Sequence, residues 1–184
     1  MNANRPLPAN FQVALVLGGA RSGKSRYGLS LAENFPAPRL FLATGEARDE
    51  EMVARIAAHQ QERGPGWETR EVPLELPAAL GESQGRYGAI LVDCLTMWLA
   101  NLMLKEDLSA EDLTAAGQRL LAVLSRIATP TIVISNEVGL GIVPESPLAR
   151  KYRDLLGWLH QQVAQAADRV VLVVAGLPLT LKGN

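Results

Sequence analysis

Apolar residues in this chain gather in short runs that alternate with longer segments of mixed polarity. The runs are rich in Val, Ile and Leu, are apolar on both faces, and cover residues 11–17, 39–44, 89–93, 131–136 and 169–174. A run of this kind is typical of a strand at the centre of a parallel sheet, where helices cover both faces. The pattern therefore predicts central, parallel strands.

The segments between these runs have the spacing of amphipathic helices. They cover residues 49–63, 95–104, 110–128 and 147–167, and parallel strands require such crossover connections. Residues 67–72 alternate in polarity and are a candidate further strand, whereas residues 73–85 fit a short helix or a loop equally well. The predicted fold class is α/β, with a mostly parallel sheet flanked by helices.

Size and charge narrow the range of functions. Because no linker-like stretch interrupts the 184 residues, we expect residues 1–184 to form a single domain. The formal net charge of −1 gives no general attraction to polyanions, so neither nucleic acid nor a membrane is an expected partner. The only cysteine, Cys94, allows no intrachain disulfide and no thiolate metal cluster, which suits a reducing cytoplasm.

A glycine-rich segment directly follows the first apolar run. Its residues fit the spacing G-x-x-x-x-G-K-[ST] and are Gly18, Gly19, Ala20, Arg21, Ser22, Gly23, Lys24 and Ser25. Glycine permits backbone angles that turn successive N–H groups toward phosphate oxygens, and the helix that follows adds its positive end. A turn that merely joins strand to helix is the alternative. Because strand, loop and helix come in the required order, we interpret the segment as a phosphate-binding loop that binds a nucleotide.

Three side chains at this edge of the predicted sheet suit phosphoryl chemistry. Lys24 is expected to reach the β- and γ-phosphates, and the Ser25 hydroxyl is expected to bind Mg²⁺. Asp93 ends its strand where such a metal sits, and its carboxylate is the second expected Mg²⁺ ligand. An aspartate at this place could instead cap the helix that begins near Leu95. We favour the Mg²⁺ role because the loop already points to a nucleotide.

His59 is a further candidate, on the polar stripe of the predicted helix 49–63. A lone histidine on such a face is usually only solvated. A neutral imidazole can also shuttle a proton or accept a phosphoryl or nucleotidyl group, so the residue pattern leaves both roles open.

The loop 136–144 leaves the end of a strand, on the edge where parallel sheets bind ligands. Asn136 and Glu137 offer hydrogen bonds or metal contacts there, and an ordinary turn is the alternative. Farther along, a group of charged residues fits a solvated helical face or a contact with phosphates, namely Arg150, Arg153 and Asp154.

Together these segments resemble the bifunctional adenosylcobinamide kinase/adenosylcobinamide-phosphate guanylyltransferase family of cobalamin biosynthesis. The resemblance runs nearly from end to end and rests on 18–26, Ala43, Thr44, Asp49, Glu51, Met52, Arg55, Ile56, His59, Arg63, Trp67, Glu71, 93–98, Asn101, Leu102, 135–144, Arg150, Arg153, Asp154, Gln161, Ala167, Asp168 and 172–182. The residues beyond the phosphate-binding loop are more specific than the loop, which many unrelated nucleotide enzymes share.

The resemblance implies a P-loop NTPase with a RecA-like sheet, assembled as a homotrimer. It implies ATP or GTP with Mg²⁺ as kinase donor, GTP as guanylyl donor, and adenosylcobinamide and its phosphate as the other substrates, with adenosylcobinamide-GDP as product. In that family the matching histidine becomes guanylylated, so the resemblance makes His59 the nucleophile of the guanylyl transfer. Lys24 is the expected catalytic residue of the kinase step. It also adds Glu71 and Asp93 to the nucleotide-binding residues.

One position departs from the family, which commonly has asparagine where this chain has His160. We expect His160 to be a helix-surface histidine without a function. Two other functions fit the residues. The chain could be a kinase for another small metabolite, with His59 structural, or a nucleotide-switched regulatory module without turnover.

Overall fold

The computed structural model of this chain describes residues 11–45, 64–105 and 108–183. The described strands form one sheet in the order β3-β2-β4-β5-β1-β6-β7. They are β1 (Val13–Gly18), β2 (Arg39–Ala43), β3 (Trp67–Glu71), β4 (Ile90–Asp93), β5 (Thr131–Asn136), β6 (Arg169–Val174) and β7 (Leu177–Lys182). Neighbouring strands are parallel except for the β6–β7 pair. The predicted α/β class is confirmed.

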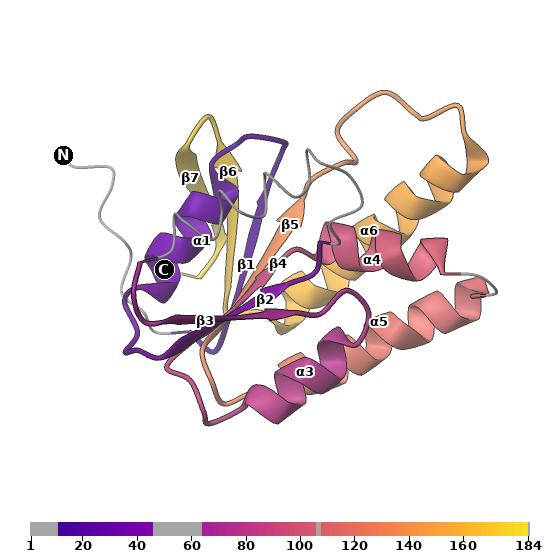
Figure 1. The fold of residues 1–184 in the computed structure, drawn as a ribbon. Coiled ribbons are helices and arrows are strands. Elements are labelled where there is room, and N and C mark those ends of the chain that lie inside the picture. Colours follow the sequence, from indigo (N-terminus) through magenta and orange to yellow (C-terminus); the bar gives the residue numbers. More distant parts are fainter. Residues whose placement is uncertain (1–10, 46–63, 106–107, 184) are drawn as a thin grey trace.

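Helices cover both faces of this sheet (Figure 1). They are α1 (Lys24–Ala32), α3 (Leu76–Ser83), α4 (Leu95–Leu104), α5 (Ala110–Leu124) and α6 (Pro147–Ala166). In Figure 1, α1 lies on one side of the strands, and α3, α4, α5 and α6 lie on the other. A capping box at Ser109 fixes the start of α5, where the Ser109 side chain and Asp112 satisfy each other's backbone N–H groups.

The core has one hydrophobic cluster on each face of the sheet. Alternate residues of β1 point to opposite clusters, with Leu15 and Leu17 on the face of α4, α5 and α6 and Val16 on the face of α1. This period of two explains why the strand is apolar throughout rather than alternating. On the α1 face, a Cβ at Gly28 would stand 2.8 Å from the Ile134 Cδ1 atom, so glycine lets this helix approach the sheet closely.

Most elements lie where the pattern predicts them. Helix α4 and strands β5 and β6 have the predicted bounds, and β1 extends one residue further to include Gly18. The alternating segment 67–72 contains a parallel edge strand, and the ambiguous segment 73–85 contains helix α3. The predicted helix 49–63 lies outside the described residues. Among the described helices, none is long and apolar enough to cross a membrane.

Strand β7 is the element that the pattern does not predict. It turns back from β6 at Ala175 and Gly176, which have φ angles of 52° and 78°, and pairs with β6 in antiparallel order. The antiparallel direction needs no crossover helix, so the two strands join directly. The sheet therefore ends in a hairpin next to the strand that precedes the glycine-rich loop.

Candidate functional site

The glycine-rich loop connects the end of β1 at Gly18 to the start of α1 at Lys24. Gly23 is the N-cap residue of α1 and has a left-handed φ of 93°, a conformation that glycine adopts without strain. Gly18 is needed for space, because a Cβ there would stand 2.6 Å from the Val173 carbonyl oxygen and 2.5 Å from the Ser22 hydroxyl. Gly18 is therefore required for space and Gly23 for its backbone conformation, as expected in a phosphate-binding loop.

The β6–β7 turn supports this loop from outside. The Gly176 N–H donates to the Ser22 carbonyl oxygen at 2.8 Å, and within the loop the Ser22 N–H donates to the Gly19 carbonyl oxygen at 3.2 Å. A Cβ at Gly23 would stand 3.3 Å from the Gly176 Cα atom. The β6–β7 hairpin, which the sequence pattern does not predict, thus helps to position the glycine-rich loop, which the pattern does predict.

The N-terminus of α1 is suited to an anion. No side chain caps the helix at Gly23, and its first turn holds no acidic residue. The Lys24 ammonium group folds back over the loop and donates to the Gly19 carbonyl oxygen at 3.2 Å. Uncapped N–H groups, the positive end of the helix and a lysine together form a phosphate-binding site.

Asp93 ends β4 at the same edge of the sheet, with β5 between it and the loop strand β1. Burial, and then the neighbouring Asp93 carboxylate, raise the pKa of the Cys94 thiol to about 11, while the Lys24 charge lowers it slightly. Lys24 and Asp93 therefore both lie within electrostatic range of one thiol, which stays protonated at neutral pH. The N-cap of α4 is Cys94, not Asp93. The alternative of Asp93 as a helix cap is thus wrong.

The end of β4 is held in place by Thr44, which follows β2 and is fully buried. Its hydroxyl accepts from the Cys94 N–H and donates to the Cys94 carbonyl oxygen, each at 2.7 Å. The Asn101 amide on α4 in turn donates to the Thr44 carbonyl oxygen at 2.7 Å. The peptide bond between Asp93 and Cys94 is cis. Thr44 and Asn101 thus position Asp93, a role that their separation in sequence hides.

A second buried polar cluster lies at the end of β5. The hydroxyls of Thr96 and Ser135 are 3.1 Å apart, and the His160 Nε2 atom lies 2.7 Å from the Ser135 hydroxyl. His160 is only 7% exposed, so the expectation of a helix-surface histidine is wrong. Burial lowers the pKa of His160, and the nearby Glu137 carboxylate partly offsets this. The helical pattern hides this burial because the covering residues come from distant segments.

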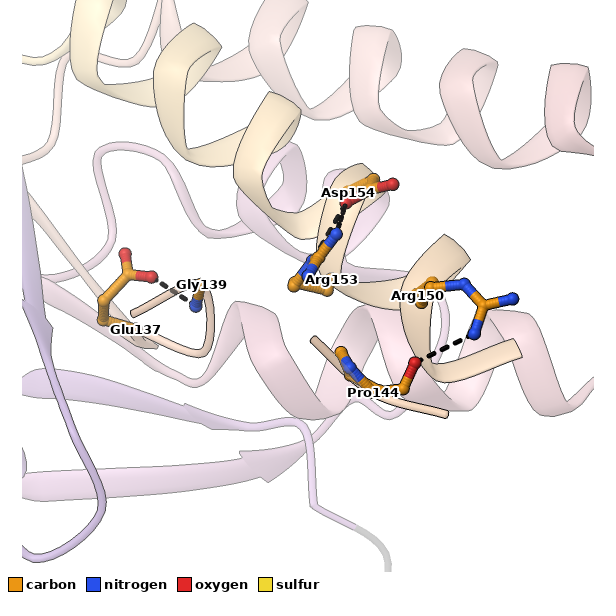
Figure 2. A network of polar contacts seen from close by, with 6 residues as sticks. All are labelled: Glu137, Gly139, Pro144, Arg150, Arg153 and Asp154. Atoms are coloured by element: carbon orange, nitrogen blue, oxygen red, sulfur yellow. Dashed lines mark hydrogen bonds and ion pairs between the residues drawn. The ribbon is translucent and has the colours of Figure 1, made fainter. Parts of the chain in front are cut away.

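Figure 2 shows the polar contacts of the loop 137–144 and the start of α6. The Glu137 carboxylate accepts from the Gly139 N–H at 2.6 Å, and Arg150 donates to the Pro144 carbonyl oxygen at 2.9 Å. Arg153 pairs with Asp154 at 2.9 Å. Glu137 therefore shapes the loop and Arg150 holds it against the helix start, whereas the Arg153–Asp154 pair joins two neighbours within α6.

The remaining predicted site residues fall in two groups. Gly19, Ala20 and Arg21 are exposed on the loop, and Glu71 is exposed at the end of β3. Glu71 is in register with Ala43, which is in register with Asp93, so Glu71 lies at the same edge of the sheet. His59 lies outside the described residues.

The donor set fits Mg²⁺ rather than a metal held by the protein alone. Ser25 and Asp93 offer a hydroxyl and a carboxylate oxygen, the ligand types that this hard cation prefers. Among residues 11–45, 64–105 and 108–183, no group of three or more His, Cys, Asp or Glu side chains could hold a metal ion. A cation at this edge would therefore depend on nucleotide oxygens for much of its shell, as Mg²⁺ commonly does.

Comparison with known proteins identifies the family. A family model described as "Cobinamide kinase / cobinamide phosphate guanyltransferase" matches residues 14–181. The chain belongs to this family. The bifunctional adenosylcobalamin biosynthesis protein CobP of Pseudomonas aeruginosa is 46% identical over 170 residues, which cover 92% of this chain and 97% of the relative. The protein CobU of Salmonella typhimurium, with the same description, is 38% identical, with 91% of this chain and 98% of the relative covered.

Solved structures support the fold independently of close sequence similarity. An ATPase from the type III secretion system of pathogenic bacteria has a TM-score of 0.53 and 11% identity, with 92% of this chain and 56% of that chain covered. This likeness is one of fold alone, and it agrees with the mostly parallel sheet flanked by helices in this cobinamide kinase/guanyltransferase family member. The predictions of family and fold class are thus both confirmed.

Proposed function

We propose that this chain phosphorylates adenosylcobinamide with ATP or GTP and then transfers GMP from GTP to the product, giving adenosylcobinamide-GDP. The proposal is supported by a glycine-rich loop that leads into Lys24 and Ser25 at the start of α1, by Asp93 at the same edge of the sheet, and by the family match. A general nucleotide-binding protein needs the loop alone, whereas the family match extends over residues 14–181.

The kinase step uses the edge described above. The loop N–H groups and Lys24 hold the β- and γ-phosphates, and the hydroxyl of the aminopropanol arm of adenosylcobinamide attacks the γ-phosphorus atom. A new P–O bond forms, the bond to the β-phosphate oxygen breaks, the hydroxyl proton passes to solvent, and the nucleoside diphosphate leaves. Lys24 stabilises the charge that develops during transfer. Ser25 and Asp93 would hold Mg²⁺, which would neutralise phosphate charge.

The guanylyl transfer is proposed to proceed through His59, and its support is the family resemblance. An imidazole nitrogen attacks the α-phosphorus atom of GTP, a P–N bond forms and pyrophosphate leaves. A phosphate oxygen of adenosylcobinamide phosphate then attacks the same phosphorus atom, and the P–N bond breaks. The histidine returns to its free form, and the product contains a new P–O–P linkage.

Product analysis tests the proposal. The purified chain is incubated with Mg²⁺, ATP and adenosylcobinamide, and then with GTP, and each corrinoid product is identified by mass spectrometry. The expected products are a monophosphate ester and then the GDP derivative, with pyrophosphate released in the second stage. If the monophosphate forms but GTP never converts it, the chain is a kinase without guanylyltransferase activity. Binding of nucleotide without any corrinoid product would favour the regulatory module.

We propose further that the chain assembles as a homotrimer, as the family resemblance implies. Large apolar side chains exposed on the segment 138–148 support self-association, with Leu140 86% and Ile142 98% exposed. Light scattering coupled to size-exclusion chromatography measures the mass directly. A mass near that of one 19.8 kDa chain at micromolar concentration would contradict the assembly.

A further inference from the structure

The buried cluster at the end of β5 lies directly beside the phosphate-binding loop. Strand β5 pairs with the loop strand β1, and Asn136 is in register with Gly18, the first loop residue. The next residue, Glu137, donates its N–H to the Gly18 carbonyl oxygen at 3.1 Å. The end of β5 is therefore joined to the first residue of the loop by backbone pairing.

The hydrogen bonds of the cluster have one consistent direction. The Asn136 N–H donates to the Thr96 hydroxyl oxygen at 2.7 Å, which leaves the Thr96 hydroxyl hydrogen for Ser135, 3.1 Å away. The Ser135 hydroxyl hydrogen is then free for the His160 Nε2 atom at 2.7 Å. In the reverse direction Nε2 would carry the imidazole proton, and the unprotonated Nδ1 atom would face the Glu137 carboxylate 3.8 Å away, which is electrostatically unfavourable.

In the favoured direction His160 ends this hydrogen-bond chain as a neutral imidazole that accepts at Nε2. Its proton then lies on Nδ1, which faces the Glu137 carboxylate at 3.8 Å. The same carboxylate accepts from the Gly139 N–H and so shapes the loop after β5. His160 therefore contacts the end of β5 at Ser135 and the following loop at Glu137.

The residue types Ser135, His160 and Glu137 are also those of a hydrolase triad, but their burial excludes that reading. Ser135 is fully buried and His160 is 7% exposed, so no substrate carbonyl or phosphate can reach the serine hydroxyl. In the described structure, the neighbouring Asn136 Oδ1 atom is buried and has no hydrogen-bond partner. The cluster thus fixes an unsatisfied amide oxygen level with Gly18.

We propose that His160 is a positioning residue for the kinase site: it ends a directed hydrogen-bond chain that fixes the end of β5 against Gly18. This inference rests on the proposed kinase function. Loss of the Nε2 acceptor leaves the Ser135 hydroxyl buried without its partner, and the chain that holds Asn136 loosens. Small displacements of groups around transferring phosphates reduce turnover strongly.

Kinetics of matched variants test the proposal. His160→Leu keeps an apolar volume but no acceptor, whereas His160→Gln places an amide oxygen near the former Nε2 position. Val163→Ala is the control, because Val163 is fully buried on the same helix and belongs to the hydrophobic core. We expect His160→Leu to lower the kcat of the kinase step about tenfold with the KM for ATP little changed, and His160→Gln to restore most of it.

The control separates positioning from stability. Val163→Ala should lower the thermal midpoint without an equal loss of kcat. If His160→Leu loses no more kcat than Val163→Ala, or if His160→Gln restores none, the proposal is wrong. Should His160→Leu not fold, Ser135→Ala interrupts the same chain at its middle hydroxyl, and wild-type kcat in that variant would equally overturn the proposal.

A spectroscopic measurement keeps this result distinct from failure of the proposed function. Imidazole nitrogen shifts, recorded by NMR and assigned by comparison with His160→Gln, report the tautomer. We expect the proton on Nδ1 and none on Nε2. A proton on Nε2 would contradict the proposed direction of the hydrogen-bond chain. If the wild-type protein forms no phosphorylated corrinoid, the kinase function is refuted instead. The tautomer of His160 would then still show whether the hydrogen-bond chain has the proposed direction.

Discussion

Replacement of Gly18 by alanine tests whether close packing holds the phosphate-binding loop in place. The added Cβ would stand 2.6 Å from the carbonyl oxygen of Val173, its register partner on β6, and 2.5 Å from the Ser22 hydroxyl. The Ser22 side chain can move, but the Val173 oxygen belongs to the sheet backbone. The two strands must separate locally, or the loop must leave its position.

Gly19→Ala is the matched control for this substitution. A Cβ at Gly19 would meet no heavy atom within 4 Å, and Gly19 is not among the residues with positive φ. Both variants reduce the entropy of the unfolded chain equally, by about 0.4–1 kcal/mol. The difference between them therefore isolates the overpacking, which we expect to cost about 1–3 kcal/mol.

The assay is unfolding without nucleotide, so that ligand contacts of Gly19 do not enter. For a chain of this length each kcal/mol shifts the thermal midpoint by about 2–4 °C, so Gly18→Ala should melt roughly 2–12 °C below Gly19→Ala. Binding of ATP to Gly18→Ala should be weaker than to the wild type. Equal midpoints for the two variants would refute the packing argument.

Three further predictions follow from the site. Lys24→Ala should slow kinase turnover about a hundredfold, since it removes about 3 kcal/mol of transition-state stabilisation; turnover within threefold of wild type in a folded variant would contradict this. Asp93→Asn should raise the Mg²⁺ concentration required for half-maximal kinase activity, and an unchanged Mg²⁺ titration would remove Asp93 from the site. Burial lowers the pKa of His160 below its usual 6.5, so as the pH falls the unfolded protein binds a proton at this histidine before the folded protein does, and stability declines below pH 6.5. His160→Gln should flatten this decline, as measured by urea unfolding at pH 7.5, 6.5 and 5.5. An equal pH dependence of stability in the variant and the wild type would contradict this.

The fold was predictable where local pattern decides the structure. Runs that are apolar on both faces indicate central strands, and β5 and β6 have the predicted bounds for that reason. Strand β7 lies at the exposed edge of the sheet, and its direction depends on a turn in which Ala175 has a positive φ. Alanine gives no sequence signal for that conformation, so the hairpin could not be predicted.

The candidate site, like the fold, could be predicted from the sequence only in part. The phosphate-binding loop is a contiguous motif with a fixed spacing, so the sequence alone reveals it. The sequence also placed Lys24 and Asp93 at the same edge, because the carboxyl ends of parallel strands meet there. The groups that hold this edge come from distant parts of the chain. The Thr44 contacts with Cys94 span 50 positions, and the contact of His160 with Ser135 spans 25. Helical periodicity alone gave the wrong expectation for His160.

The most direct test of the complete account is covalent labelling of the protein by GTP that carries a radioactive α-phosphate. The account predicts one labelled peptide containing His59, with a P–N linkage that is lost in mild acid and stable in base, because protonation makes the nitrogen a better leaving group. His59→Ala should remove the label and retain much of the kinase activity, since the two steps use different residues. A label that persists in His59→Ala, or that maps to a serine or lysine, would contradict transfer through this histidine.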